Sequence, residues 1–309
     1  MQALSRTESA ARAERVTEPV DAVGESPVWR AKEESLYWVD IPQRRIHRLH
    51  LASGRRDSWT TPEAVACIAF AADGSIIAGM ESGIFGVRLG EGGAVDAARL
   101  AAPRFPMAGM RFNDGRCDRQ GRFWAGTMHT DMPAANAVGE LYRYTDEEGL
   151  SESFARALLT QNGLAWSPGG ERMYLSDSHP NARVIWAYDY ECDSGTPYGR
   201  RVFVDMRSHA GRPDGAAVDA DGCYWTCAND SGQVLRFTPA GVLDRALAIP
   251  AKKPSMCAFG GARLDTLYVT TIRPAKPEDA AAQPLAGAVF ALRPGVQGLA
   301  ETHFQRRKP

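Results

Sequence analysis

The sequence predicts an all-β fold and, within that class, a six-bladed β-propeller. Two repeated patterns carry this prediction. Six segments each combine an apolar pair, a turn with Gly or an acidic residue, and a short aromatic-rich strand. A period-two strand, most often introduced by Gly, follows each of these segments. The repeat length of about 40 to 50 residues, with several short strands per unit, is typical of propeller blades.

The two series run in step along the chain. The aromatic-rich strands have their second apolar residue at Tyr37, Ile77, Trp124, Tyr174, Trp225 and Tyr268. The strands that follow have their first apolar residue at Ile46, Ile84, Leu141, Ile185, Val234 and Val289. A small sheet cannot bury both of its faces alone, so such units stack around an axis. A β-sandwich gives no reason for six equal units.

Composition narrows the possible partners and the domain plan. The chain has 309 residues, 44% of them hydrophobic, with a formal net charge of −1. We expect one propeller domain over residues 16–309, after a short, flexible lead-in at residues 1–15. The balanced charge argues against nucleic acid or an anionic membrane as a partner. No apolar run reaches the ~20 residues of a membrane span. Six cysteines without a Cys-x-x-Cys pair favour free thiols and a cytoplasmic protein.

A polar register recurs at the start of the expected innermost strands. Counting back from the turn of each repeat gives Glu25, Ala66, Asn113, Asn162, Asp214 and Ser255. Four of these residues carry carboxylate or amide oxygens and would face one axis, where the oxygens repel one another unless a cation lies between them. Oxygen-only ligands favour Ca²⁺, then Mg²⁺ or Mn²⁺; Zn²⁺ and Fe²⁺ are also candidates. The competing interpretation is turn chemistry, because Asn-Gly and Asp-Gly are turn formers. We read Asp114-Gly115 as such a turn.

Five motifs carry a resemblance to a known family. GESPVW, RFNDGRCDRQGRFWAGTM, QNGLAWSPGGERMYLSD, PDGAAVDADGCYWTC and CAFGGARLDTLYVTT, in this order, resemble the regucalcin and gluconolactonase family. The resemblance extends from Val20 to Pro294. It implies a six-bladed propeller with one divalent metal ion at its centre. It also implies hydrolysis of a sugar-acid lactone, the common activity of the bacterial members.

The resemblance also assigns roles to individual residues. The metal ligands fall on Glu25, Asn162 and Asp214. Asp214 also matches the general base of the family, and the substrate-contacting pair falls on Arg111 and Asn113. An acidic substrate contact after the G-T-M motif falls on Asp131, in a stretch that departs from the family pattern.

Two longer loops are expected to set the choice of substrate. They span residues 129–139 and residues 178–183, and each follows an aromatic-rich strand. His179 in the second loop is a candidate substrate contact, and His129 in the first is left open. His47 and His50 lie on an alternating outer strand and are expected at the surface.

The sequence thus predicts a hydrolase acting on carboxylic esters, a lactonase of carbohydrate metabolism, with a sugar lactone as its small-molecule partner. The metal would polarise the carbonyl, and Asp214 would assist the attack of water. Two alternatives stay open: a calcium-binding regulatory propeller with little catalysis, and a related propeller esterase for a non-sugar ester. A monomer and a weak homo-oligomer are both compatible with the sequence, which does not determine the sugar, its ring size or the native metal.

Overall fold

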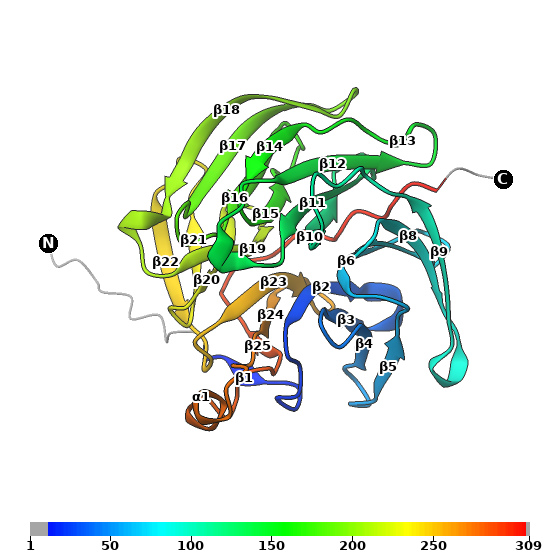
Figure 1. Ribbon diagram of the computed structural model, residues 1–309. Coiled ribbons are helices and arrows are strands. Elements are labelled where there is room, and N and C mark those ends of the chain that lie inside the picture. The colour runs from blue at the N-terminus through cyan, green and yellow to red at the C-terminus, as the bar shows by residue number, and fades with distance from the viewer. Residues whose placement is uncertain (1–11, 307–309) are drawn as a thin grey trace, which may run out of the picture.

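Six antiparallel sheets are arranged around a central axis, which confirms the six-bladed propeller (Figure 1). The computed structural model describes residues 12–306. Residues 1–11, which make up most of the predicted lead-in, lie outside the described part. Five sheets have four strands, and the third has five.

The innermost strands lie next to the axis, and the aromatic-rich strands pair with them. The innermost strands are β2 (Gly24–Arg30), β6 (Val65–Phe70), β10 (Met110–Cys117), β15 (Gln161–Trp166), β19 (Arg212–Val218) and β23 (Pro254–Gly260). The second strands are β3 (Ser35–Asp40), β7 (Ile76–Met80), β11 (Phe123–His129), β16 (Arg172–Asp177), β20 (Tyr224–Asn229) and β24 (Thr266–Thr271). All six aromatic-rich anchors of the sequence pattern fall in these second strands.

The period-two series forms the third strand of each blade. These strands are β4 (Arg45–His50), β8 (Ile84–Leu89), β12 (Gly139–Thr145), β17 (Val184–Glu191), β21 (Gln233–Phe237) and β25 (Phe290–Leu292). The outer strands are β5 (Arg56–Thr60), β9 (Val95–Ala101), β13 (Gly149–Leu150) with β14 (Ala155–Leu158), β18 (Thr196–Asp205), β22 (Leu243–Ala248) and β1 (Glu14–Arg15). Short helices lie in the connections: α1 (Pro277–Ala282), η1 (Ala31–Glu33), η2 (Glu91–Gly93), η3 (Met132–Ala134) and η4 (Met206–Ser208).

The N-terminal strand β1 closes the ring by completing the sixth sheet. It pairs with β25, which itself lies beside β24 and β23. Val16 N–H donates to Val289 O over 2.9 Å. Val289 N–H donates to the hydroxyl of Thr17 over 2.8 Å. The described chain is therefore already part of the propeller at Glu14, two residues before the predicted domain boundary.

The hydrophobic core is divided into six clusters, and each of them joins two neighbouring blades. Aromatic rings make several of these contacts. The Trp124 and Trp166 rings lie 6.0 Å apart between the third and fourth blades. The Trp29 ring stacks on Tyr268 at 6.1 Å between the first and sixth blades. Blade-to-blade burial thus explains why one aromatic-rich strand recurs in every repeat.

All six innermost strands contain a register shift against the second strand, at the position of the polar register. The shifts lie between Glu25 and Val28, Val65 and Cys67, Phe112 and Gly115, Asn162 and Ala165, Pro213 and Ala216, and Pro254 and Cys257. Our reading of Asp114-Gly115 as a turn is therefore wrong, because these residues lie inside β10. A β-bulge bends a strand and re-aims its side chains, here toward the axis.

One bulge glycine shows why the local chemistry resembles that of a turn. Gly163 has a φ of +62°, and a Cβ there would lie 2.5 Å from both the Ser176 and Tyr224 hydroxyls. Only glycine has the freedom and the lack of side chain that this position needs. Bulges and turns share that requirement, so the Asn-Gly dipeptide cannot distinguish them.

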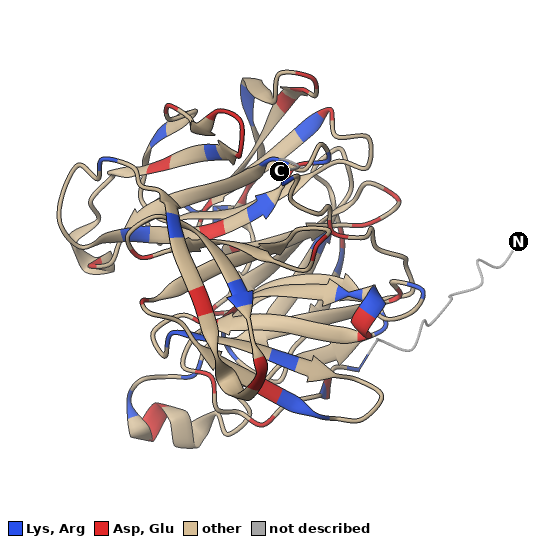
Figure 2. Cartoon of the chain, turned by 90° about the vertical axis from the view of Figure 1, so that its right-hand side faces the viewer, with Lys and Arg blue, Asp and Glu red and all other residues tan. Residues whose placement is uncertain are grey.

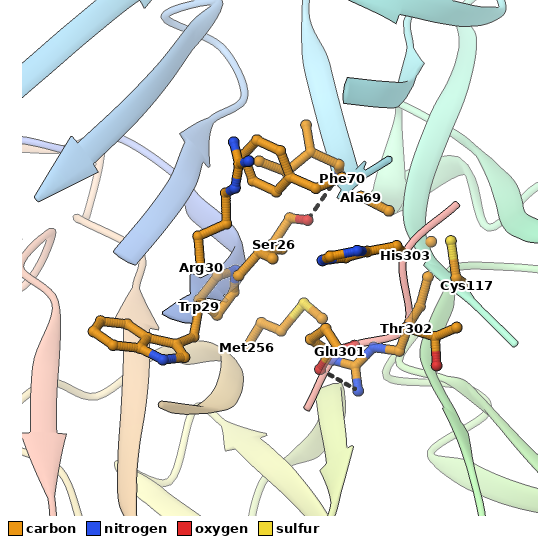
Figure 3. A pocket seen from close by; sticks show the side chains of 15 residues that line it. Ser26, Trp29, Arg30, Ala69, Phe70, Cys117, Met256, Glu301, Thr302 and His303 are labelled. Carbon is orange, nitrogen blue, oxygen red and sulfur yellow. Dashed lines mark hydrogen bonds and ion pairs between the residues drawn. The ribbon is translucent and has the colours of Figure 1, made fainter. Parts of the chain in front are cut away.

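The C-terminal segment, residues 297–306, crosses the end of the propeller opposite to the polar register (Figure 1). Phe304 forms a parallel bridge with Ala71, and Gly298 forms an antiparallel bridge with Asp219. Glu301 lies 3.4 Å from Arg116, which projects from β10. Figure 3 shows Glu301, Thr302 and His303 lining a pocket of this end together with residues of the inner strands. The segment therefore covers this end of the central channel.

Basic and acidic residues are interspersed over the strands and loops visible in Figure 2. In the described part of the chain, no helix has the length and apolar character that crossing a membrane requires.

Phe304→Ala should lower the free energy of unfolding by about 3 kcal/mol, as for other buried Phe truncations. Phe304 is 2% exposed and packs against the ring of Tyr144 at 6.0 Å. Chemical denaturation followed by tryptophan fluorescence measures the effect. Val242→Ala is the control, because Val242 is 62% exposed. Equal stability of the two variants would show that the C-terminal segment contributes little to the fold.

Candidate metal and substrate site

Three residues of the polar register come together at one end of the channel. Glu25 lies on β2, Asn162 on β15 and Asp214 on β19, each beside the bulge of its strand. Asn162 Nδ2 donates to Asp214 Oδ1 over 2.6 Å, and to Ser178 Oγ over 3.2 Å. Glu25 lies close enough to Asp214 for the two carboxylates to repel each other. The structure thus brings together the residues that the sequence predicts as metal ligands.

The electrostatics of these carboxylates suit a cation. Burial raises the pKa of Glu25 well above its usual value, and repulsion by Asp214 and Asp114 raises it further. Burial also raises the pKa of Asp214 to about 7, against the opposing effects of Arg212 and Asn229. Two buried carboxylates that destabilise each other's charged forms are stabilised by a positive charge between them. The donor set of two carboxylates and one amide therefore fits a hard divalent cation.

Asp214 has a second amide partner that the sequence analysis missed. Asn229, the last residue of β20, donates from Nδ2 to Asp214 Oδ2 over 2.6 Å. Arg212 donates from Nη2 to Asn229 Oδ1 over 3.2 Å. The only sequence signal for Asn229 is an Asn before Asp-Ser-Gly, which looks like an ordinary turn.

Arg111 and Asn113 lie at the same end of the channel and contact each other. Arg111 Nη1 donates to Asn113 Oδ1 over 2.9 Å and to Phe112 O over 2.7 Å. Asn113 Nδ2 donates across to the fourth blade, to Gln161 O, over 2.7 Å. Burial lowers the pKa of Arg111, while Glu25 opposes this shift. Asn113 thus orients the guanidinium beside the carboxylates.

Both predicted specificity loops begin at this end of the propeller. His129 pairs with Met110, the residue before Arg111. Asp177 pairs with Gln161, the residue before Asn162. The loops that follow, residues 129–139 and 178–183, therefore start beside the site.

One hydrogen bond connects the two loops. His179 is buried, and its Nε2 lies 3.0 Å from Met132 O. The His179 Nδ1 accepts the N–H of Asn181 over 3.1 Å, so Nε2 carries the proton and donates to Met132. Asp131 is exposed and accepts the N–H of Ala134 over 3.4 Å, as the N-cap of η3. In this structure His179 therefore holds the loop that carries Asp131.

Asp114 is a second residue whose role the sequence analysis missed. It is 4% exposed, and its Oδ2 accepts the N–H of Leu164 over 2.9 Å. Burial raises its pKa, while Arg116 opposes this shift. Asp114 joins the third and fourth blades just behind the site.

A separate cluster of Asp21, Asp40 and His47 in the first blade also has the spacing of a metal site. Its oxygens already have donors, because Asp40 accepts the N–H groups of Ala22 and Val23. Asp21 accepts two further hydrogen bonds. Trp38 Nε1 donates to Oδ2 over 2.7 Å, and Arg56 Nη2 donates to Oδ1 over 3.0 Å. We interpret the cluster as a buried ion pair with Arg56 as its cation.

His47 corrects an expectation from the sequence. It is 4% exposed rather than at the surface. Its Nδ1 lies 2.6 Å from Ser58 Oγ and its Nε2 lies 3.5 Å from Asp21 Oδ1. Burial and the charges of Arg56 and Arg45 lower the pKa of His47 to about 3. β4 is a third strand rather than an outer one, and both of its faces are buried at Ile46 and His47, so alternation does not mark the surface here.

The fold and the site define a six-bladed propeller with buried oxygen donors at one mouth of its channel. Residues 23–273 match the model of the SMP-30/Gluconolactonase/LRE-like region, and the chain belongs to this family. The chain is 40% identical to a 6-deoxy-6-sulfogluconolactonase of Pseudomonas putida, over 91% of this chain and 94% of the relative. It is 32% identical to the pentonolactonase XacC of Haloferax volcanii, over 93% and 96% of the two chains.

A solved structure agrees with this family assignment. The calcium-binding protein regucalcin from Agrobacterium tumefaciens superimposes with a TM-score of 0.87 and 26% identity, covering 96% of this chain and 98% of the other.

Replacing Arg56 by Gln should destabilise the fold by about 3 kcal/mol at about pH 7.5, and by less at about pH 5. Burial raises the pKa of Asp21 to about 6, so the folded state binds this proton more tightly than the unfolded state does. The contribution of Asp21 to stability therefore falls as pH rises from about 4 through about 6. Without Arg56, a proton on Asp21 neutralises the unpaired carboxylate only at the lower pH.

Urea denaturation at the two pH values measures this difference. Arg55→Gln is the control, because Arg55 is 66% exposed and pairs with Asp57. An equal loss of unfolding free energy in Arg56→Gln at both pH values would show that Asp21 carries no charge in the folded protein.

Proposed function

We propose that this protein is a metal-dependent lactonase that hydrolyses a sugar-acid lactone. The observation that carries the proposal is the buried carboxylate of Asp214, which lies between two amides and repels a second carboxylate at the mouth of the channel. A base, a cation site and a guanidinium at one end of the channel are the groups that ester hydrolysis needs. The named activities of the lactonase relatives support the same reaction class.

Glu25, Asn162 and Asp214 would hold the cation. Asn162 points its Nδ2 at Asp214 in this structure, and a half-turn of the amide presents its oxygen instead. Hard oxygen donors favour Ca²⁺, while Mg²⁺, Mn²⁺, Zn²⁺ and Fe²⁺ remain candidates. When bound, such a cation polarises the lactone carbonyl and stabilises the negative charge that develops on its oxygen.

The side chains of this protein then perform the proton transfers and hold the substrate. Asp214 accepts a proton from water as the water oxygen bonds to the carbonyl carbon. The ring C–O bond then breaks, and the ring oxygen takes the proton back from Asp214. Arg111 uses Nη1 for its hydrogen bonds to Phe112 O and Asn113 Oδ1, and its other N–H groups would donate to the substrate oxygens. Asn113 keeps the guanidinium in place.

Substrate choice would depend on the loops at the mouth of the channel, because the blade frame is fixed by its core. Asp131 offers acceptor oxygens to the hydroxyls of the sugar. His179 acts on the same loop through Met132, either in addition to a substrate contact or in place of one. A polar substituent far from the ring carbonyl would meet these residues.

A calcium-binding protein with little catalysis is the second candidate, favoured by the likeness to a calcium-binding regucalcin. Measuring acid release from glucono-, galactono-, arabinono- and xylonolactone, with and without a chelator, distinguishes a lactonase from a calcium-binding protein with little catalysis. A lactonase opens at least one of these lactones and stops when the metal is removed.

Asp214→Ala should abolish both calcium binding and lactone hydrolysis, because it removes a ligand and the base together. Glu25→Ala and Asn162→Ala should weaken calcium binding. Isothermal titration with CaCl₂ and a pH-stat assay measure the two effects, and unchanged circular dichroism verifies the fold. Near-normal hydrolysis by Asp214→Ala would rule out the proposed mechanism.

Asp131→Ala should change the ranking of the four lactones by about tenfold in kcat/KM without altering calcium affinity, because it removes one polar contact. His179→Ala should change the same ranking through the displaced loop. Arg111→Ala should raise KM for every lactone alike. A ranking that stays the same in both loop variants would locate selectivity elsewhere.

A further inference from the structure

A chain of hydrogen bonds in the fifth blade ends on the Asp214 oxygen that does not contact Asn162. Arg212 donates to Asn229 Oδ1, and Asn229 Nδ2 donates to Asp214 Oδ2. A guanidinium carries donors only, so it fixes which end of the Asn229 amide is oxygen and which is nitrogen. Asp214 Oδ2 therefore always meets an N–H donor.

Arg212 is itself anchored on every side. Its Nε donates to Asp230 Oδ2 over 2.7 Å, and its Nη1 donates to Ser178 O over 2.9 Å. Together with the bond to Asn229, these contacts hold the planar guanidinium in one orientation. Asn229 is 1% exposed, so water does not compete for its amide. The array is rigid, and it faces only one of the two oxygens of Asp214.

We propose that Asn229 and Arg212 are positioning residues that make Asp214 a one-oxygen metal ligand. This inference rests on the proposed lactonase function. A carboxylate without such a restraint can bind a hard cation through both oxygens. Asp214 would then have no oxygen left for the proton of water. The hydrogen bond from Asn229 turns Oδ2 away from the ligand side and leaves it one lone pair for that proton.

The array also serves both proton transfers. The proton of water moves to Asp214 Oδ2 as the bond between the water oxygen and the carbonyl carbon forms. It moves on to the ring oxygen as the ring C–O bond breaks, which leaves a hydroxy acid and an ionised Asp214. Asn229 donates to Oδ2 before and after this cycle, so it holds the carboxylate in one rotamer throughout.

The test compares Asn229→Ala with the wild type and with Asp214→Ala. We expect kcat to fall about thirtyfold in Asn229→Ala, the usual effect of removing a partner of a metal ligand. We expect its calcium Kd to stay within about threefold or to become tighter, because Oδ2 is then available as an additional ligand oxygen. Asp214→Ala should lose both lactone hydrolysis and calcium binding. Titration calorimetry with CaCl₂ and steady-state kinetics supply the readouts.

Two further variants control for packing. Ser231→Ala removes a hydroxyl from the turn after the same strand, where it bonds Ala228 O, and should leave kcat and Kd unchanged. Arg212→Lys retains the charge and loses the donor fork, so kcat should fall about tenfold with calcium affinity retained. If Asn229→Ala does not fold, Arg212→Lys alone decides the question.

The outcomes separate this inference from the proposed function. Unchanged kcat in Asn229→Ala, with a wild type that a chelator inhibits, overturns the inference and leaves the lactonase standing. A calcium Kd weakened more than about threefold in Asn229→Ala also overturns it, because Asn229 would then support the ligands rather than separate the two oxygens. A wild type that opens no lactone refutes the proposed function, and the calcium Kd of Asn229→Ala still decides the positioning role by the same limit.

Discussion

Burial of both faces of each small sheet is the constraint on which the rest of this structure depends. A blade of about four short strands has too little area to be stable alone, so each must pack against two neighbours. The six interblade clusters satisfy that need only if the ring closes. Closure comes from the N-terminal strand in the sixth sheet, reinforced by the hydroxyl of Ser255, which donates to Gly24 O over 2.5 Å. The site is therefore held by the whole ring rather than by one domain edge.

The bulges convert that frame into a site. In a regular strand, successive side chains alternate between the two faces of the blade and pack against neighbouring blades. A shift at the same place in all six inner strands redirects side chains toward the axis instead. Two buried carboxylates then lie near each other, and burial raises the pKa of both. Under the proposed function, a cation between them would stabilise their charged forms.

The two loops have a different role from the packed blades. His179 joins the fourth-blade loop to the third-blade loop, so a change in either loop is transmitted to the other. Their separation from the interblade clusters allows their sequences to vary while the ligand positions stay fixed. The opposite end of the channel is covered by the C-terminal segment, so the proposed substrate would reach the carboxylates from the loop end.

The sequence by itself determined the number of blades and the polar register, because both are local patterns repeated along the chain. Strand alternation and aromatic anchors recur every blade, and counting from them aligns Glu25, Asn162 and Asp214. Only the tertiary structure decided that Asp114 lies in a bulge, that His47 is buried and that the tail covers one channel end. The contacts of Asn229 with Asp214 and Arg212 were likewise decided only by the tertiary structure. Their contacts depend on strand pairing and on side-chain direction at a bulge, and an Asn beside a Gly or Asp has the same local chemistry in a turn as in a strand.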